Sequence, residues 1–186
     1  YDNISIAESS LLNAYSKLFD EEYKILKLFS PPFSDGKKNP GYVKGYVSGL
    51  RENGGQYTHA AIWGAYGYFC MASSEKKLGR INKASEFLRC GEQILLYSNP
   101  AFRCSFSCDK NIREAYFAEP YCIAADIYSN AENRGRAGWT QYTGAAGWYY
   151  RTMLEKFFGI FLSEIESEHA KIVFSKDTAY PFPERL

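Results

Sequence analysis

The sequence has almost no excess charge of either sign and no basic run. Its 186 residues include 22 Lys or Arg and 21 Asp or Glu, which leaves a net charge of +1. Proteins that bind a nucleic-acid backbone usually cluster positive charge on one face, so nucleic acid is not an expected partner. The length and the 46% apolar content suit one large globular domain.

Long hydrophobic runs are also missing. A membrane-spanning helix needs roughly 20 apolar residues, whereas the run HAAIWGAYGYFCMAS at residues 59–73 is shorter and begins with His. Residues 1–10 lack a Met, a basic stretch and the apolar core of a signal peptide. We therefore expect no membrane span in this segment and a chain that begins within a longer protein.

No metal-binding pattern is present. Cys104 and Cys108 form a C-x3-C pair without a second pair, and both histidines, His59 and His169, lie far from it in the sequence. Structural zinc sites need four ligands at characteristic spacings. The five cysteines predict reduced, mostly buried thiols in a cytoplasmic protein, and no bound metal.

Aromatic residues, in contrast, are abundant. The 16 Tyr, 13 Phe and 3 Trp make up 17% of the chain. Tyr and Trp combine a flat apolar face with a polar group, which suits a packed core and also suits a sugar ring. We assign Trp63 and Trp148 to the core, while Trp139 remains open to either role.

The spacing of apolar residues predicts helices joined by long glycine-rich loops. Residues 33–56 and 131–141 are the two glycine-rich loops, and residues 101–118 read as irregular. Helical hairpins with long loops at one end fit a barrel or solenoid better than a compact bundle. The predicted helical segments are 6–28 (a short helix and a second short element), 58–72, 82–97, 119–130 and 142–165.

Two of these helix starts could bind an anion. With Thr58 as N-cap, His59 would lie in a first turn, where free backbone N–H groups and the helix dipole favour negative charge. Thr143 and Gly144 repeat the arrangement at residue 142 onward. Each site is open to two interpretations: an oxyanion site, or a His that merely packs and a Thr that caps its helix.

Charged residues near the glycines are further candidates. Glu52 lies in RENGGQ and Glu119 in AEPY, and a carboxylate held in a turn accepts hydrogen bonds from sugar hydroxyls. Pairing of Glu52 with Arg51, or a helix N-terminal role for Glu119, remains equally open. Arg134 and Arg136 are either cationic ligands for an anion or members of a solvated loop.

Three motifs carry a family resemblance. GYVKGYVSGLRENGGQYTHAAIW, EPYCIAADIYSN and GRAGWTQYTGAAGWYYR resemble the C-terminal half of the catalytic barrel in glycoside hydrolase family 94, over residues 25–160. That family includes cellobiose and chitobiose phosphorylases and the C-terminal domain of cyclic β-1,2-glucan synthases. The resemblance implies an all-α fold, part of an (α/α)6 barrel. Residues 1–169 would form the C-terminal half of that barrel, and residues 170–186 would leave it.

The resemblance also implies residue roles. His59, Thr143 and Gly144 would bind inorganic phosphate. The implied reaction is inverting phosphorolysis of a β-linked oligosaccharide or disaccharide, in which an acid protonates the glycosidic oxygen while phosphate attacks the anomeric carbon from the opposite face. It releases a sugar 1-phosphate and requires no cofactor, because phosphate is a substrate. The implied sugar-binding residues are Glu52, Gln56, Tyr57 and Glu119.

The catalytic acid of the family is absent from this chain. It is an Asp in an upstream motif, and Asp2, Asp20 and Asp35 stand in unrelated contexts. We therefore expect no catalytic residue here, an inactive isolated chain, and the remainder of a parent polypeptide as a partner. Family members often dimerise, so a homodimer is one assembly open to the chain.

The sequence departs from the family pattern in two places. Ser48 stands where Pro is expected, and residues 96–118 form an enlarged excursion that leaves the identity of the acceptor sugar open.

Two functions other than phosphorolysis are also open. They are a non-catalytic carbohydrate-binding helical module and an inverting hydrolase on the same barrel. The His59 and Thr143 pair argues against the hydrolase, because attacking water needs no anion clamp.

Overall fold

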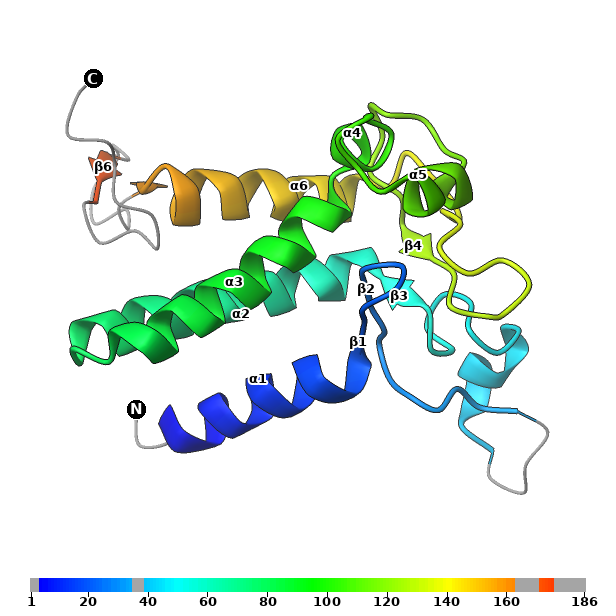
Figure 1. Cartoon of the computed structure of the whole chain (residues 1–186), viewed down its shortest axis with the longest axis horizontal. Helices are drawn as coiled ribbons and strands as arrows, with labels where there is room; N and C mark the ends of the chain where they lie inside the picture. Colours follow the sequence, from blue (N-terminus) through cyan, green and yellow to red (C-terminus); the bar gives the residue numbers. More distant parts are fainter. Residues whose placement is uncertain (1–3, 35–38, 163–170, 176–186) are drawn as a thin grey trace.

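The computed structural model describes residues 4–34, 39–162 and 171–175, and these are mainly helical (Figure 1). The predicted helical class is therefore confirmed, while the (α/α)6 barrel stays a prediction. The α-helices are α1 Ile4–Leu18, α2 Thr58–Lys77, α3 Ile81–Ser98, α4 Pro100–Arg103, α5 Lys110–Tyr116 and α6 Thr143–Thr152. A 3-10 turn, η1, spans Gly41–Gly45, and a π-helical turn, η2, spans Met153–Phe157.

Among the described residues, the strands form three short antiparallel pairs. β1 Phe19–Asp20 pairs with β2 Ile25–Leu26, so the expected element after the first helix is a small hairpin. β5 Ile160–Leu162 pairs with β6 Ile172–Phe174. The pair that matters for the site is β3 Gln56–Tyr57 with β4 Asp126–Ile127, since it brings the end of the first glycine-rich loop beside the segment that precedes the second.

The main core lies between α2 and α3, an antiparallel hairpin linked through residues 78–80. Phe69 of α2 and Phe87 of α3 are almost completely buried, and burying a side chain of this size contributes about 1.5–3 kcal/mol. Gly91 permits the close approach, because a Cβ there would lie 3.0 Å from Phe69 Cε1. Helices α1 and α6 lie on opposite sides of this hairpin (Figure 1).

The excursion at residues 96–118 is more ordered than predicted. It folds into α4 and α5, whose N-termini are capped by the side chains of Asn99 and Asp109. Arg103 is fully buried and donates to the carbonyl oxygens of Tyr23, at 3.2 Å, and Lys24, at 2.8 Å. Burial lowers the pKa of Arg103 to about 10. This side chain therefore fastens the excursion to the β1–β2 hairpin.

In the second half of the chain, one helix prediction was wrong and another was too long. Residues 119–130 form no helix, because Asp126 and Ile127 pair with β3 instead. The predicted helix at 142–165 ends as α6 at Thr152, continues as the η2 turn and stops at Gly159, whose φ of +62° breaks the helical path before β5.

Several residue assignments also need correction. Thr58 and Thr143 are the first helical residues rather than N-caps; the N-caps are Tyr57 and Tyr142, and neither uses its side chain. Trp63 is 52% exposed, so its assignment to the core was wrong. Trp148 is half-buried against the core, as expected.

The five cysteines form no disulfide, and Cys90 and Cys108 are buried. Burial raises the pKa of the Cys90 thiol to about 11, which makes it a poor nucleophile.

Candidate functional site

The RENGG loop is held in shape by Asn53. This side chain is 1% exposed, and its amide donates to the carbonyl oxygens of Phe33, at 2.9 Å, and Tyr46, at 2.8 Å. Its side-chain oxygen accepts from the Phe33 N–H at 2.8 Å. Gly54 takes φ +88°, and a Cβ there would lie 2.8 Å from Pro32 Cβ. The loop therefore needs both the amide and the glycine.

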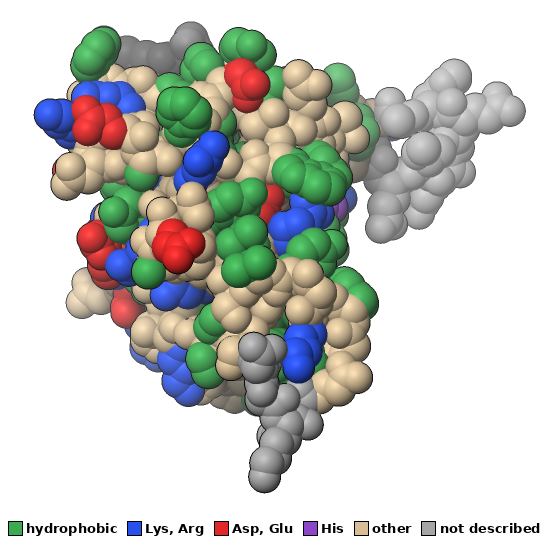
Figure 2. All heavy atoms as spheres, turned by 90° about the vertical axis from the view of Figure 1, so that its right-hand side faces the viewer, with side chains coloured by type: hydrophobic (Ala, Val, Ile, Leu, Met, Phe, Trp, Pro, Cys, Tyr) green, Lys and Arg blue, Asp and Glu red, His purple; other side chains and the backbone are tan. Residues whose placement is uncertain are grey.

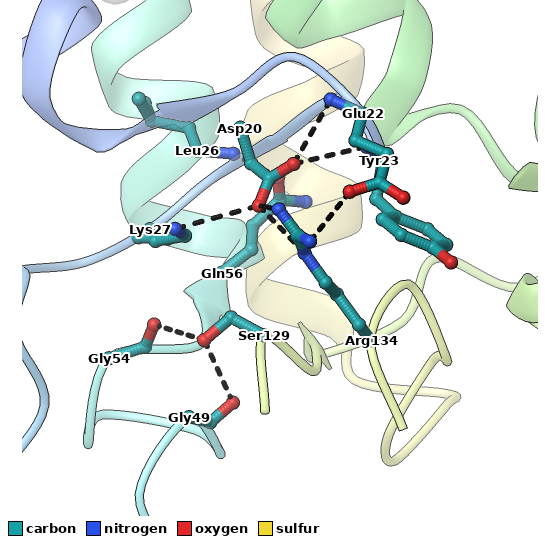
Figure 3. A network of polar contacts seen from close by, with 10 residues as sticks. All are labelled: Asp20, Glu22, Tyr23, Leu26, Lys27, Gly49, Gly54, Gln56, Ser129 and Arg134. Carbon is teal, nitrogen blue, oxygen red and sulfur yellow. Dashed lines mark hydrogen bonds and ion pairs between the residues drawn. The ribbon is translucent and has the colours of Figure 1, made fainter. Parts of the chain in front are cut away.

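Ser129 joins this loop to the second motif. Its backbone N–H donates to the Gly49 carbonyl oxygen at 2.8 Å. Its hydroxyl donates to the carbonyl oxygen of Gly54 at 2.8 Å and lies 3.4 Å from that of Gly49 (Figure 3). Together with the β3–β4 pair, these bonds place Asp126 beside Arg51.

Arg51 is the centre of the site. Its backbone is left-handed, with φ +46°, a conformation that costs a non-glycine residue energy and is often found at functional sites. The guanidinium carbon lies 4.7 Å from the ring centroid of Trp139, 5.7 Å from that of Tyr142 and 5.6 Å from that of Tyr46. Rings at this distance attract a cation, so the aromatic side chains contribute to holding the guanidinium.

Two carboxylates face the Arg51 guanidinium. Glu52 Oε2 lies 3.6 Å from Nε, and Asp126 Oδ1 lies 4.0 Å from Nη1. Burial raises the pKa of Asp126, and the Arg51 guanidinium with the Arg51 and Trp139 backbone N–H groups only partly offsets this effect. Burial would lower the pKa of Arg51, but the charges of Asp126 and Glu52 raise it, so the guanidinium stays protonated.

His59 and Gly144 meet at the starts of α2 and α6. A Cβ on Gly144 would lie 3.1 Å from His59 Nδ1, so the imidazole packs directly against the glycine. His59 Nε2 is buried and has no hydrogen-bond partner among the described residues. The ring also lies edge-on to Trp63, with centroids 4.7 Å apart. Two helix starts that follow separate glycine-rich loops thus converge on one imidazole.

The other predicted site residues occupy different surroundings. Gln56 is 2% exposed, and its side-chain oxygen accepts the Leu26 N–H at 2.8 Å (Figure 3), so it braces β2 against β3. The Tyr57 ring lies parallel to His59, with centroids 6.4 Å apart. Thr143 is exposed beside Gly144. Glu119 is half-buried after α5, near Tyr116, and no described contact connects it to Arg51 or His59.

Arg134 is engaged within the protein. It donates to Asp20 Oδ2 from Nε at 3.0 Å and from Nη2 at 2.5 Å, and to Glu22 at 2.6 Å (Figure 3). This geometry favours a structural clamp over an anion ligand. Arg136 lies over the Phe117 ring at 5.4 Å.

The face that carries these loops has a mixed surface. Figure 2 shows hydrophobic side chains interspersed with basic and acidic ones. Trp139 is 59% exposed and Tyr142 43%, so aromatic faces next to Arg51 are open to a ligand. Within residues 4–34, 39–162 and 171–175, no group of three or more His, Cys, Asp or Glu side chains could hold a metal ion. No helix in these ranges could cross a membrane.

Comparison with known families decides the relationship. The model of the glycosyl hydrolase 94 superfamily catalytic domain matches residues 5–159. The chain belongs to this superfamily. The resemblance in the three motifs is therefore confirmed, and every predicted site residue lies inside the matched range.

Individual relatives also match most of the chain. Cyclic beta-(1,2)-glucan synthase NdvB of Rhizobium meliloti is 42% identical over 145 residues, which are 78% of this chain and 4% of that protein. The N,N'-diacetylchitobiose phosphorylase of Vibrio furnissii is 30% identical over 129 residues, 68% of this chain and 14% of the relative. That of Vibrio proteolyticus is 28% identical over 136 residues. The chain thus spans a small part of each relative.

Sequence reasoning missed the role of Asp126. In EPYCIAADIYSN it stands between apolar residues, which is the pattern of a buried position, but a buried helix explained that pattern equally well. The signal that could have identified it is a lone acidic residue in an apolar run, because a buried carboxylate needs a cationic partner. Arg51 is that partner.

Proposed function

We propose that this chain supplies the phosphate- and sugar-binding residues of an inverting glycoside phosphorylase that acts on β-linked glucans or disaccharides. The carrying observation is the contact between His59 and Gly144, which brings the starts of α2 and α6 together. Helix starts leave backbone N–H groups without helical partners, so two helix starts beside an imidazole favour an oxyanion. The names of the relatives, a glucan synthase and two phosphorylases, support the same reading.

In this proposal phosphate binds between the helix starts, held by His59, Thr143 and Gly144. The sugar binds on the Arg51 side, where Glu52 accepts hydroxyl hydrogen bonds and Tyr57 lies between the two sites. An acid elsewhere in the parent polypeptide gives its proton to the glycosidic oxygen. A phosphate oxygen then forms the new bond to the anomeric carbon as the glycosidic bond breaks, with inversion.

The first test is phosphate-dependent release of glucose 1-phosphate from β-1,2-gluco-oligosaccharides. It compares the longest native polypeptide that contains this chain with the 186-residue chain alone. Release by the long form only is the expected result. Release of free glucose without phosphate would point to a hydrolase. No turnover with a panel of β-linked disaccharides, together with retained sugar binding, would point to a carbohydrate-binding module.

The His59→Ala substitution tests the phosphate site in the long form. We expect the apparent KM for phosphate to rise roughly tenfold or more, with a much smaller change in the KM for glucan, because only phosphate loses a partner. Lys76→Ala, on the exposed far end of the same helix, is the matched control. An equal loss for both substrates would contradict the assigned role.

A further inference from the structure

The Arg51 guanidinium lies between two carboxylates but forms no hydrogen bond with either side chain. Its distances of 3.6 Å to Glu52 and 4.0 Å to Asp126 exceed the 2.7–3.2 Å of a normal N–H···O bond. The four facing atoms are all buried and have no hydrogen-bond partner among the described residues: Arg51 Nε and Nη1, Glu52 Oε2 and Asp126 Oδ1. Glu52 therefore keeps one buried oxygen uncommitted although a guanidinium lies close by.

Asp126 is the more firmly held of the two carboxylates. It is 0% exposed, whereas the Glu52 side chain is 21% exposed. Its Oδ2 accepts the Arg51 backbone N–H at 3.2 Å, and its backbone pairs with Tyr57 in the β3–β4 pair. The carboxylate also packs against Gly138, since a Cβ there would lie 2.2 Å from Oδ1. Asp126 thus lies in one of the three family motifs and touches the other two.

We propose that Asp126 is a positioning residue that keeps Glu52 available for the sugar by holding Arg51 away from it. This inference rests on the proposed function. Asp126 fixes the left-handed backbone of Arg51 through Oδ2 and attracts its guanidinium through Oδ1. Without the Asp126 charge, the guanidinium would move toward Glu52 and form a charge-assisted pair. That pair would commit the Glu52 carboxylate, whose side chain is 21% exposed, to Arg51 instead of to the sugar hydroxyl.

The test is Asp126→Asn in the longest native polypeptide. We expect the KM for gluco-oligosaccharide to rise roughly tenfold while the KM for phosphate changes less than about twofold. Asp109→Asn, which preserves an N-cap on α5, is the control and should leave both constants unchanged. Adding Arg51→Gln to Asp126→Asn should recover part of the loss, because the competing guanidinium is gone. A merely structural role would give no such recovery.

Two results would overturn the inference: equal effects on both KM values, or a double variant no better than Asp126→Asn. Calorimetric titration with the gluco-oligosaccharide in the absence of phosphate distinguishes failure of the inference from failure of the proposed function. Weaker oligosaccharide binding by Asp126→Asn than by wild type supports the inference even where no sugar 1-phosphate is released. If Asp126→Asn binds the oligosaccharide as tightly as wild type does in an active enzyme, the inference is wrong and the proposed function stands. If wild type does not bind the oligosaccharide, the inference and the proposed function are both wrong.

Discussion

Gly144 controls how closely α6 approaches the His59 imidazole. Its φ is not in the left-handed region, so the backbone tolerates a larger residue, and the constraint comes from the ring 3.1 Å away. A methyl group at this position would press on the imidazole and would also shield the first N–H groups of α6. The glycine is thus required by contact rather than by conformation.

The Gly144→Ala substitution should weaken phosphate use selectively. We expect the KM for phosphate in the long polypeptide to rise roughly threefold to tenfold, because the His59 ring must move by a few tenths of an ångström or more. Gly147→Ala, in the same helix with nothing within 4 Å of the added Cβ, should leave it unchanged. Similar kinetics for both variants would argue against phosphate at this helix start.

The loop at residues 46–57 shows how an irregular element is made rigid. It contains no long helix or strand. Instead, the Asn53 side chain forms hydrogen bonds with three backbone groups. A buried backbone group without a partner costs as much as a lost hydrogen bond. The amide therefore determines the position of Arg51 and Glu52, which precede it.

The Asn53→Ala substitution should destabilise the chain by about 1–3 kcal/mol, the cost of leaving buried polar groups unpaired. Urea unfolding monitored by circular dichroism measures this difference. Asn39→Ala removes a single hydrogen bond to the Gly41 N–H at an exposed position and should cost less than about 1 kcal/mol. Equal losses in the two variants would show that Asn53 is not the brace of the loop.

Across the whole molecule, Arg134 and Asp20 connect segments 114 residues apart. The Asp20 carboxylate is buried, accepts the backbone N–H groups of Glu22 and Tyr23, and lies 3.5 Å from the Lys27 ammonium (Figure 3). Burial alone would raise the pKa of Asp20, but the Arg134 hydrogen bonds, the Tyr23 N–H and the two positive charges lower it overall. The clamp joins the β1–β2 hairpin to the second glycine-rich loop.

This clamp should make stability depend on acidity. A carboxyl whose pKa is lower in the folded than in the unfolded chain stabilises the fold at pH values above its unfolded pKa, about 3.9. This contribution is lost as the pH falls through the folded pKa. Asp20→Asn should therefore lower the free energy of unfolding by about 1–3 kcal/mol at pH 7, with a smaller deficit at pH 3. Urea unfolding at both pH values measures it.

Glu22→Gln is the matched control for the clamp, since Glu22 binds the same Arg134 but its side chain is 64% exposed. An exposed ion pair contributes about 0–1 kcal/mol. A deficit for Asp20→Asn that did not shrink between pH 7 and pH 3 would contradict the assigned charge effect.

Local patterns determined much of this protein from the sequence alone. The apolar spacing predicted α3 at 82–97, and the structure has it at Ile81–Ser98; the start of α2 at residue 58 was also correct. The ordered motifs around RENGG and YTGAAGW identified the superfamily. These features were readable because helical periodicity and motif order are properties of neighbouring residues.

Only the tertiary structure decided which distant groups meet. Asp126 lies in β4 rather than a helix because its backbone pairs with Tyr57, and its charge faces Arg51, 75 residues earlier. Trp63 meets the rings of His59 and Trp148 but stays 52% exposed, which an all-round apolar helix does not reveal. The apolar pattern indicates that a residue is buried or paired. Which residue it then contacts depends on how distant parts of the chain fold against each other. For the same reason the contact between His59 and Gly144 required the packed structure.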